Sequence, residues 1–285
     1  MCRLVAYTGD EILLANVLVK PDDSLVKQSL LAKETTTPTN GDGFGVGWYV
    51  PKISEHPAAF LSVFPAWSDE NLLHLTKKIE SGLFFAHVRA ASIGGVNTYN
   101  CHPFIYKNWM FMHNGQIHNF LAIKRAIIQL VDDDIYHWIR GGTDTEHFFA
   151  LLLQLGKNKD LSKSSAVVEL LFTALTIVAD LIKQAGIAGP SYYNMCLSDG
   201  KRLFATRYCT DKTIEPESLH YLDGTYYWSK EDRLAQGNKT PHRSVLISSE
   251  QLTDFNDEWQ TVPANHLLIV EADYSIQIQA IPPLE

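Results

Sequence analysis

The feature that most constrains the fold is a β-strand expected almost at the N-terminus. Residues Cys2 to Tyr7 are mostly apolar and include strand-forming types, so this stretch is predicted to be extended. Chain termini fray unless a secondary-structure element ties them down. A strand at this position would pin the terminus inside a sheet, and with it the side chain of Cys2.

Cys2 acquires special chemistry if the initiator Met1 is removed, which a small second residue permits. It would then carry a thiol and a free α-amine, whose reference pKa is about 7.7–8. Such an amine can act as the general base for the thiol of the same residue. The alternative is that Cys2 is an inert small residue. The nucleophile hypothesis therefore requires oxyanion donors and substrate-orienting charges elsewhere in the chain.

Composition excludes several classes of function. The chain has 285 residues, 46% hydrophobic and 20% charged, with a net charge of −8 and no basic cluster, so nucleic-acid binding is not expected. We see no apolar run close to the roughly 20 residues of a membrane span and no secretion signal. The cysteines lack paired spacing, which indicates reduced thiols and a cytoplasmic protein; they are Cys2, Cys101, Cys196 and Cys209.

A glycine-rich segment, Gly41-Asp42-Gly43-Phe44-Gly45-Val46-Gly47, alternates glycine with other residues. It does not fit the dinucleotide-binding pattern of glycines and lacks the lysine of a phosphate-binding loop. The period of two predicts an extended segment with one face free of side chains. Such a face permits close approach of a ligand or of another backbone. A glycine-rich hairpin without a functional role is the alternative.

The stretch Leu83 to Ala90 is predicted to be a buried strand that ends in Arg89, followed by a turn at Ser92 to Gly95. A buried arginine requires an anionic partner. Arg89 is therefore expected either in a structural salt bridge or as a fork for a substrate carboxylate.

A second apolar strand, Trp109 to Met112, is expected to stop at His113-Asn114-Gly115. Asn-Gly after a strand is typical of a tight turn. The same turn can also direct an Asn114 side-chain N–H and the Gly115 backbone N–H toward one point. That pair of donors is what an oxyanion hole needs.

Thr143 and Glu146 have the spacing of a capping box, so Gly141-Gly142 is expected to precede a helix. Asp144 would lie in its first turn, where the helix dipole favours a negative charge. Helix stabilisation alone accounts for Asp144. The carboxylate could also hold a substrate ammonium group.

The remaining pattern predicts mixed strands and helices at the front, paired helices in the middle and antiparallel strands at the end. This order favours an α+β fold of layered sheets and helices in a single domain, residues 2–285. The other expected helices are 11–18, 24–31, 119–130 and 164–184, the loops are 33–40 and 132–134, and the late strands are 192–197, 202–208, 221–228, 244–248, 266–270 and 275–281.

Six short motifs now occur in a fixed order from residue 2 to about residue 150. Together they resemble a class II glutamine amidotransferase domain of the N-terminal-nucleophile hydrolase superfamily. The resemblance rests on Met-Cys-Arg, Gly-Asp-Gly-Phe-Gly-Val-Gly, Ala-His-Val-Arg-Ala, Asn-Cys-His-Pro-Phe, His-Asn-Gly and Gly-Thr-Asp-Thr-Glu. It implies a four-layer αββα sandwich.

The resemblance also implies a role for each matching residue. These roles are Cys2 as nucleophile, Asn114 and Gly115 as the oxyanion pair, Arg89 and Ser92 for the substrate α-carboxylate, Asp144 for the α-ammonium, and His102, Asp42 and Gly43 as supporting residues. The implied reaction is hydrolysis of a γ-glutamyl amide, glutamine or a γ-glutamyl compound, through a thioester on Cys2. No cofactor is implied.

Two departures from the family pattern concern the substrate. Family members with synthase partners have Arg-Trp after the histidine, whereas Ala90 follows Arg89 here, and no arginine precedes Asp42 in the glycine loop. This form resembles a stand-alone branch that includes the γ-glutamyl amidase of ergothioneine biosynthesis and an amidotransferase-like component of glutathione degradation.

Three further hypotheses stay open. One is a glutaminase subunit that passes ammonia to a separate synthase, so that a synthase or peptidase partner protein would be involved. Another is a non-catalytic binding module. A metal hydrolase is the weakest, because its candidate ligands lack a metal-binding spacing; they are His87, His102, His113 and His118.

Overall fold

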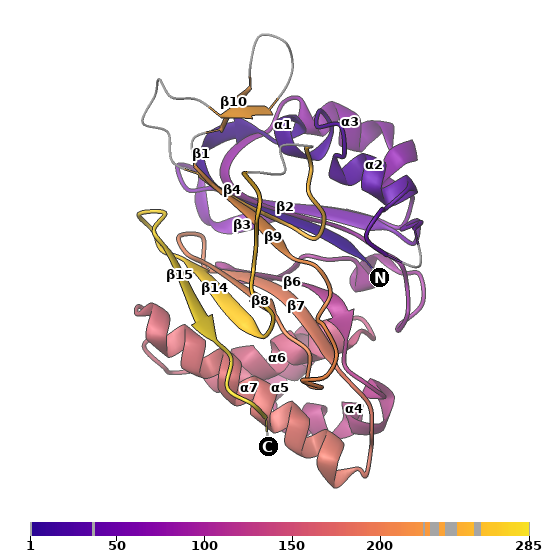
Figure 1. Ribbon diagram of the computed structural model, residues 1–285. Helices are drawn as coiled ribbons and strands as arrows, with labels where there is room; N and C mark the ends of the chain where they lie inside the picture. The colour runs from indigo at the N-terminus through magenta and orange to yellow at the C-terminus, as the bar shows by residue number, and fades with distance from the viewer. Residues whose placement is uncertain are drawn as a thin grey trace.

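The chain folds into four layers in the order helices, sheet, sheet, helices (Figure 1). The structure is a computed structural model that describes residues 2–35, 38–224, 226–228, 234–236, 244–253 and 258–284. Four predictions include residues outside these ranges. They are Met1 of the first motif, Thr36 and Thr37 of the expected loop 33–40, Thr225 of the expected strand 221–228, and Glu285 at the end of the expected domain. The predicted α+β class and αββα layering are confirmed.

The first sheet has seven strands, and the N-terminal strand is at its centre. In spatial order they are β13 (Gln260–Thr261), β9 (His220–Gly224), β12 (Ser244–Ser248), β1 (Arg3–Leu13), β4 (Glu80–Val88), β2 (Phe44–Val50) and β3 (Ser54–Ser62). Val5 of β1 lies opposite Ser248 of β12 on one side and Ala86 of β4 on the other. Antiparallel pairing on both sides therefore fixes the terminus, as predicted.

The second sheet has six strands and lies face to face with the first (Figure 1). Its order is β15 (Ile276–Ala280), β14 (His266–Val270), β8 (Leu203–Arg207), β7 (Tyr192–Ser198), β6 (Trp109–Gln116) and β5 (Phe104–Tyr106). Each neighbouring pair is antiparallel. A separate small ribbon joins β10 (Tyr226–Trp228) to β11 (Leu234–Gln236).

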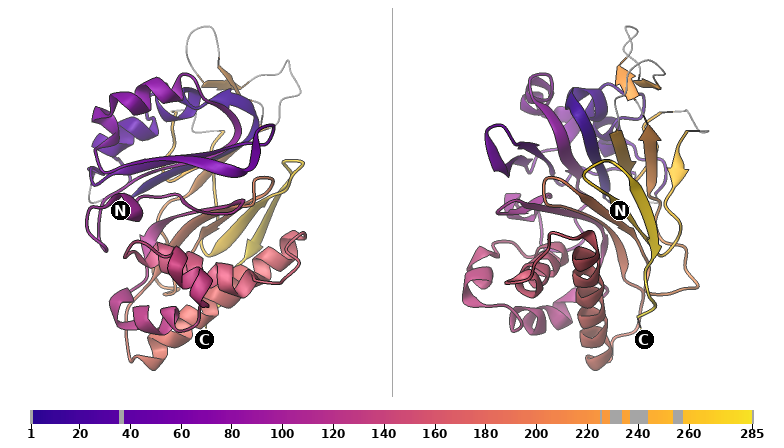
Figure 2. Two further views of the ribbon diagram at one scale, coloured as in Figure 1. Left: turned by 180° about the vertical axis from the view of Figure 1, so that it is seen from behind. Right: turned by 90° about the vertical axis from the view of Figure 1, so that its left-hand side faces the viewer.

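The helices form the two outer layers (Figures 1 and 2). The first sheet is covered by α1 (Ala15–Leu18), α2 (Leu25–Leu30) and α3 (Glu70–Thr76). The second is covered by α4 (Phe120–Ile128), α5 (Asp133–Trp138), α6 (Asp144–Gly156) and α7 (Ser164–Gln184). Two 3₁₀ turns, η1 (Ala66–Ser68) and η2 (Thr98–Asn100), lie in the connections.

Side chains of the central strands alternate between two cores. In β1, Leu4 and Ala6 enter the core between the sheets, whereas Val5 and Tyr7 pack under α1–α3. Because both faces of each sheet are covered, these strands need apolar residues at consecutive positions. This is why residues 4–7 are apolar at every position.

Two predictions about where helices begin were wrong. A helix was expected over 11–18, but β1 continues to Leu13 because Ile12 and Leu13 pair with Ser81 and Glu80 of β4. The helix comprises only Ala15–Leu18. The acidic stretch 132–134, expected as a loop, instead begins α5, whose first turn carries Asp133 and Asp134. Negative charges there interact favourably with the helix dipole.

The membrane expectation also needs a correction. Helix α7, Ser164–Gln184, has 21 residues and a mean hydropathy of 2.0, so by length and composition alone it could cross a bilayer. One such helix is weak support for a membrane span, because core helices pass the same test. In the fold, Val167, Leu171 and Val178 of α7 are buried against the second sheet.

The glycines of β2 permit close approach of another part of the backbone. A Cβ atom at Gly45 would overlap the carbonyl oxygen of His102, and one at Gly47 would lie 2.7 Å from Cγ of Pro103. The His102–Pro103 peptide is cis. The alternating glycines therefore allow the turn before β5 to pack directly on β2. The glycine face of β2 thus contacts another part of the backbone.

Candidate active site

The Cys2 thiol lies at the end of the first sheet where β1 begins and β4 ends. Its Sγ atom is 3.4 Å from the backbone nitrogen of Ala90 and 3.5 Å from the Ala90 carbonyl oxygen. The Ala90 N–H donates to sulfur, and the thiol can donate to the carbonyl. Cys2 is half-buried, and burial raises the pKa of its thiol. The Ala90 N–H and the positive charges of Arg89 and Arg3 act in the opposite direction on that pKa.

Arg3 fixes the backbone of Cys2, and the sequence patterns gave no sign of this role. Its guanidinium is 1% exposed and lies 2.5 Å from Glu250 Oε1. It also donates to the carbonyl oxygens of Cys2, at 2.7 Å, and Glu34, at 3.0 Å. The Glu250 carboxylate in turn accepts the N–H groups of Lys33 and Glu34, at 2.8 and 2.9 Å. The buried charges are thus paired and hydrogen-bonded.

Ser249 joins the nucleophile strand to the expected oxyanion residue. Its Oγ accepts the Leu4 N–H at 3.0 Å and an amide N–H of Asn114 at 3.3 Å, and its own N–H donates to the Leu4 carbonyl. Asn114 is fully buried, and its Oδ1 atom has no hydrogen-bond partner among the described residues. The Ser249 hydroxyl therefore connects the two sheets. It binds the first sheet at Leu4, two residues after Cys2, and the second sheet at Asn114.

Asn114 and Gly115 lie within a strand, so the predicted tight turn is wrong. β6 continues through both residues, with Asn114 opposite Asn194 and Gly115 opposite Tyr193 of β7. Pairing with β7 overrides the local turn preference of Asn-Gly. A Cβ atom at position 115 would overlap the Tyr192 carbonyl, so glycine is needed there for close packing.

Arg89 follows β4 directly and is held by the glycine-rich loop. Its N–H donates to the Gly43 carbonyl at 2.8 Å, and its own carbonyl accepts the Asp42 N–H at 2.9 Å. Gly43 has φ +112°, a value that favours glycine. The Asp42 carboxylate accepts the Ala91 N–H at 2.8 Å. Asp42 and Gly43 therefore support the strand end beside Cys2.

The Arg89 guanidinium is 3% exposed, and its observed partners are carbonyl oxygens. Nη1 donates to Gly95 at 2.6 Å and Nη2 to Ile93 at 2.7 Å. Within the described part of the chain no carboxylate pairs with it, so the structural salt bridge is not found there. Further N–H groups are available for an anion. Ser92 is exposed in the same loop.

Asp144 begins α6, and its carboxylate is 6% exposed. Oδ2 accepts the Ile117 N–H at 2.8 Å, and Oδ1 accepts the Thr145 N–H at 2.9 Å. Thr143 Oγ1 accepts the Glu146 N–H at 3.2 Å, which confirms the predicted cap. In a capping box the Glu146 carboxylate would accept the backbone N–H of Thr143. Here it accepts the N–H groups of Arg140 and Gly141 instead.

Three buried histidines lie behind the site. The rings of His87 and His102 are 4.2 Å apart between centroids, and all four ring nitrogens lack partners among the described residues. Burial lowers the pKa of His87 to about 3 and also lowers the pKa values of His102 and His113. Neutral imidazoles fit the supporting role expected for His102. Among the described residues, no three potential ligands cluster as a metal site would require.

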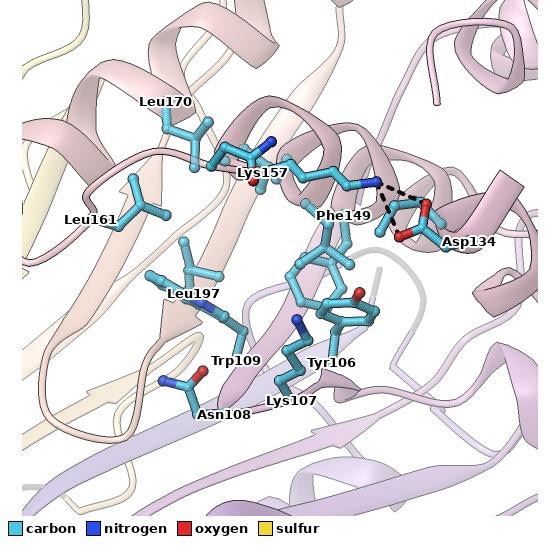
Figure 3. A pocket seen from close by; sticks show the side chains of 15 residues that line it. Tyr106, Lys107, Asn108, Trp109, Asp134, Phe149, Lys157, Leu161, Leu170 and Leu197 are labelled. Atoms are coloured by element: carbon cyan, nitrogen blue, oxygen red, sulfur yellow. Dashed lines mark hydrogen bonds and ion pairs between the residues drawn. The ribbon is translucent and has the colours of Figure 1, made fainter. Parts of the chain in front are cut away.

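A well-formed pocket of about 310 Å³ lies elsewhere, between the β5–β6 turn and helices α5–α7. Figure 3 shows its apolar wall, including Phe149, Leu161 and Leu170, and Lys157 paired with Asp134 at its edge. None of the residues expected to act in catalysis lines it. This pocket is therefore separate from the residues expected to act in catalysis.

A thiol at the start of a central strand in a two-sheet sandwich is the arrangement of N-terminal-nucleophile hydrolases. The chain belongs to one family of that type, the class II glutamine amidotransferases, because the profile described as glutamine amidotransferases class-II matches residues 1–281. The resemblance inferred from the motifs is thereby confirmed.

Two curated relatives span nearly the whole chain. It is 34% identical to the probable glutamine amidotransferase DUG3 of Saccharomyces cerevisiae, over 95% of this chain and 82% of the relative. It is 24% identical to the γ-glutamyl-hercynylcysteine sulfoxide hydrolase of Mycolicibacterium smegmatis, over 95% and 96% of the two chains.

Solved structures agree on the fold. A glutamine aminotransferase class-II domain protein from Silicibacter pomeroyi is similar with a TM-score of 0.68 and 25% identity, over 99% of this chain and all of the other. The glutamine phosphoribosylpyrophosphate amidotransferase of B. subtilis has a TM-score of 0.63 and 13% identity, and the similarity covers 49% of that chain.

Proposed function

We propose that the protein hydrolyses γ-glutamyl amide bonds, with Cys2 as the nucleophile after removal of Met1. The main support is the position of the Cys2 thiol, which a central strand holds against the Ala90 backbone beside Arg89. Family membership and the γ-glutamyl substrate in the name of the M. smegmatis relative support the choice of bond.

Arg89 and Asp144 carry opposite charges and are both nearly buried. In the proposal they bind the α-carboxylate and the α-ammonium of the γ-glutamyl group, with the Ser92 hydroxyl assisting at the carboxylate. Their backbone contacts hold them in place before substrate arrives. Fixing both charged groups places the γ-carbonyl at Cys2, which supplies the proximity contribution to catalysis.

The reaction proceeds in two halves. The α-amine of Cys2 takes the thiol proton while sulfur attacks the γ-carbonyl carbon, and the oxyanion is stabilised by N–H groups of Asn114 and Gly115. Collapse breaks the carbon–nitrogen bond, and the leaving amine takes the proton from the ammonium of Cys2. Water then attacks the thioester, which releases glutamate and restores the thiol. One oxyanion donor is typically worth roughly 10²–10³ in turnover.

The decisive experiment uses the full-length protein and 6-diazo-5-oxo-L-norleucine, a reactive ketone with the α-amino acid end of glutamine. We expect an intact mass without Met1 and one adduct, located on Cys2 by peptide mapping. Cys2→Ala should abolish both adduct and turnover while the unfolding temperature stays near that of the wild type. Retained Met1 with no adduct, or full turnover by Cys2→Ala, would contradict the proposal and favour a non-catalytic binding module.

The leaving group is tested by a substrate panel of glutamine, γ-glutamyl dipeptides and γ-glutamyl amides of simple amines. Hydrolysis of these compounds by the isolated protein supports a free-standing hydrolase. A separate partner is the second candidate, favoured by the exposed side chains of Leu30 and Leu31 near the Lys33–Glu34 segment that binds Glu250. Glutamine hydrolysis that appears only after a synthase or peptidase is added would establish it.

A further inference from the structure

The side chain of Asn100 bridges two loops that are far apart in the sequence. Asn100 ends η2 and is 2% exposed. Its amide nitrogen donates to the carbonyl oxygens of Gly94 and, at 3.2 Å, Gly95. Its Oδ1 atom accepts the Gly142 N–H at 2.9 Å. One side chain thus uses both its donor and its acceptor groups on backbone.

The two bridged loops carry the two charges proposed to bind substrate. The Gly95 carbonyl that accepts from Asn100 also accepts from Arg89 Nη1 at 2.6 Å. Gly142 lies two residues before Asp144, at the N-terminus of α6. On one side, Asn100 and the Arg89 guanidinium share the Gly95 carbonyl as acceptor. On the other side, Asn100 binds the backbone two residues before Asp144.

The bridge leaves little freedom at either end. Gly94 and Gly95 have φ of +85° and +64°, so the first loop turns sharply where Asn100 binds it. A Cβ atom at Gly141 would overlap Asn100 Oδ1 and lie 2.9 Å from Glu146 Oε2. The Glu146 carboxylate also holds the Gly141 N–H at 2.7 Å. Neither Gly94 nor Gly141 therefore has room for a Cβ atom beside the Asn100 amide.

We propose that Asn100 is a positioning residue that sets the spacing between Arg89 and Asp144 and thereby the selectivity for an L-α-amino acid end. This inference rests on the proposed function. An L-γ-glutamyl group is recognised by the relative positions of its carboxylate, its ammonium and the carbonyl at Cys2. If Arg89 and Asp144 move relative to each other, the site no longer discriminates between L and D forms of the α-amino acid end. The reactivity of the thiol itself is unaffected.

The test compares three electrophiles on the full-length protein after Met1 removal. The L and D forms of 6-diazo-5-oxonorleucine report on the α-amino acid site, and iodoacetamide reports on the thiol alone. Rate constants for modification of Cys2 are measured by mass spectrometry with peptide mapping, for the wild type, Asn100→Ala and Asn108→Ala. Asn108, on the β5–β6 turn, is a matched control, because its side-chain amide also donates to a backbone carbonyl, that of Asp199.

A displacement of about 1 Å in a binding group can reduce a rate roughly 10²-fold. For Asn100→Ala we expect the rate with the L reagent to fall about 10- to 100-fold and the L-to-D ratio to shrink. Its rate with iodoacetamide should stay within about twofold of wild type, as should all rates of Asn108→Ala. Asn100→Asp, which keeps the acceptor for Gly142 but loses the donor, should show the same selective loss and covers the case in which the alanine variant does not fold.

Two results would overturn the role of Asn100. One is an unchanged L rate and L-to-D ratio in a folded variant. The other is an equal fall with all three reagents, which would indicate general loss of structure. Failure of the proposed function has a different signature, because wild-type Cys2 would then react with iodoacetamide but show no preference for the L reagent.

Discussion

The nucleophile and the residues proposed to bind the α-amino acid end are fixed by different kinds of contact. On the nucleophile side, Arg3 pairs with Glu250 and Leu4 bonds to Ser249, which are separations of 247 and 245 residues. On the other side, Arg89 bonds to carbonyls four and six residues ahead, and Asp144 to the next N–H. The nucleophile is therefore placed only when segments about 245 residues apart meet, whereas the amino-acid site combines local turns with contacts over shorter separations, such as Ile117 to Asp144 and Asp42 to Ala91.

Glu250→Gln should have the largest effect on stability, since it leaves Arg3 buried without its counter-charge. Breaking one partner of a buried pair typically lowers the free energy of unfolding by about 3–5 kcal/mol. Denaturant unfolding measures this change, and iodoacetamide modification of Cys2 should change with it because the terminus is released.

Glu11→Gln is the matched control, since Glu11 pairs with Lys52 at 3.0 Å but both side chains are largely exposed, 47% and 67%. Exposed pairs contribute about 0–1 kcal/mol. If Glu250→Gln were as mild as Glu11→Gln, the long-range clamp would not be what holds the nucleophile.

Acid should weaken both sides together, because the buried histidines adjoin both: His87 lies opposite Leu4 of β1, and His113 contacts Thr145, next to Asp144. The folded-state pKa of His87 is about 3 and its ordinary value is 6.5, so the unfolded chain binds the proton more readily. Stability is then complete above pH 6.5 and is lost as pH falls toward 3. By linkage, His87 alone should remove about 2 kcal/mol between pH 7 and pH 5. Denaturant titrations at the two pH values measure the slope, and His87→Asn should flatten it; an unchanged slope would refute the assignment.

Thr143→Ala should have the smallest effect, because it removes one local cap. The Thr143 hydroxyl accepts the Glu146 N–H, and loss of such a cap lowers the free energy of unfolding by about 1 kcal/mol. Thermal unfolding measures the change, with Thr173→Ala, an exposed hydroxyl within α7, as the control. A loss as large as that of Glu250→Gln would show that Thr143 does more than provide a local cap.

Residues whose role follows from local pattern were predictable from the sequence. The strand after Cys2, helix α7 and strands β12 and β14 have the predicted positions. The Thr143 cap has the predicted geometry, since its spacing reflects one turn of helix. Arg3, Ser249 and Glu250 were missed because nothing near them in the chain reveals a partner about 245 residues away.

The order of six short motifs from Cys2 to Glu146 was enough to predict the family and the α+β sandwich, because that combination in that order matches the family pattern. Tertiary structure alone decided that Asn114-Gly115 continues a strand, since pairing with β7 outweighs the turn preference of that dipeptide. It also decided that the Arg89 guanidinium rests on loop carbonyls and that Asn100 joins that loop to the start of α6. These contacts depend on which distant backbone groups the packed layers bring together, and local sequence carries no record of those distances.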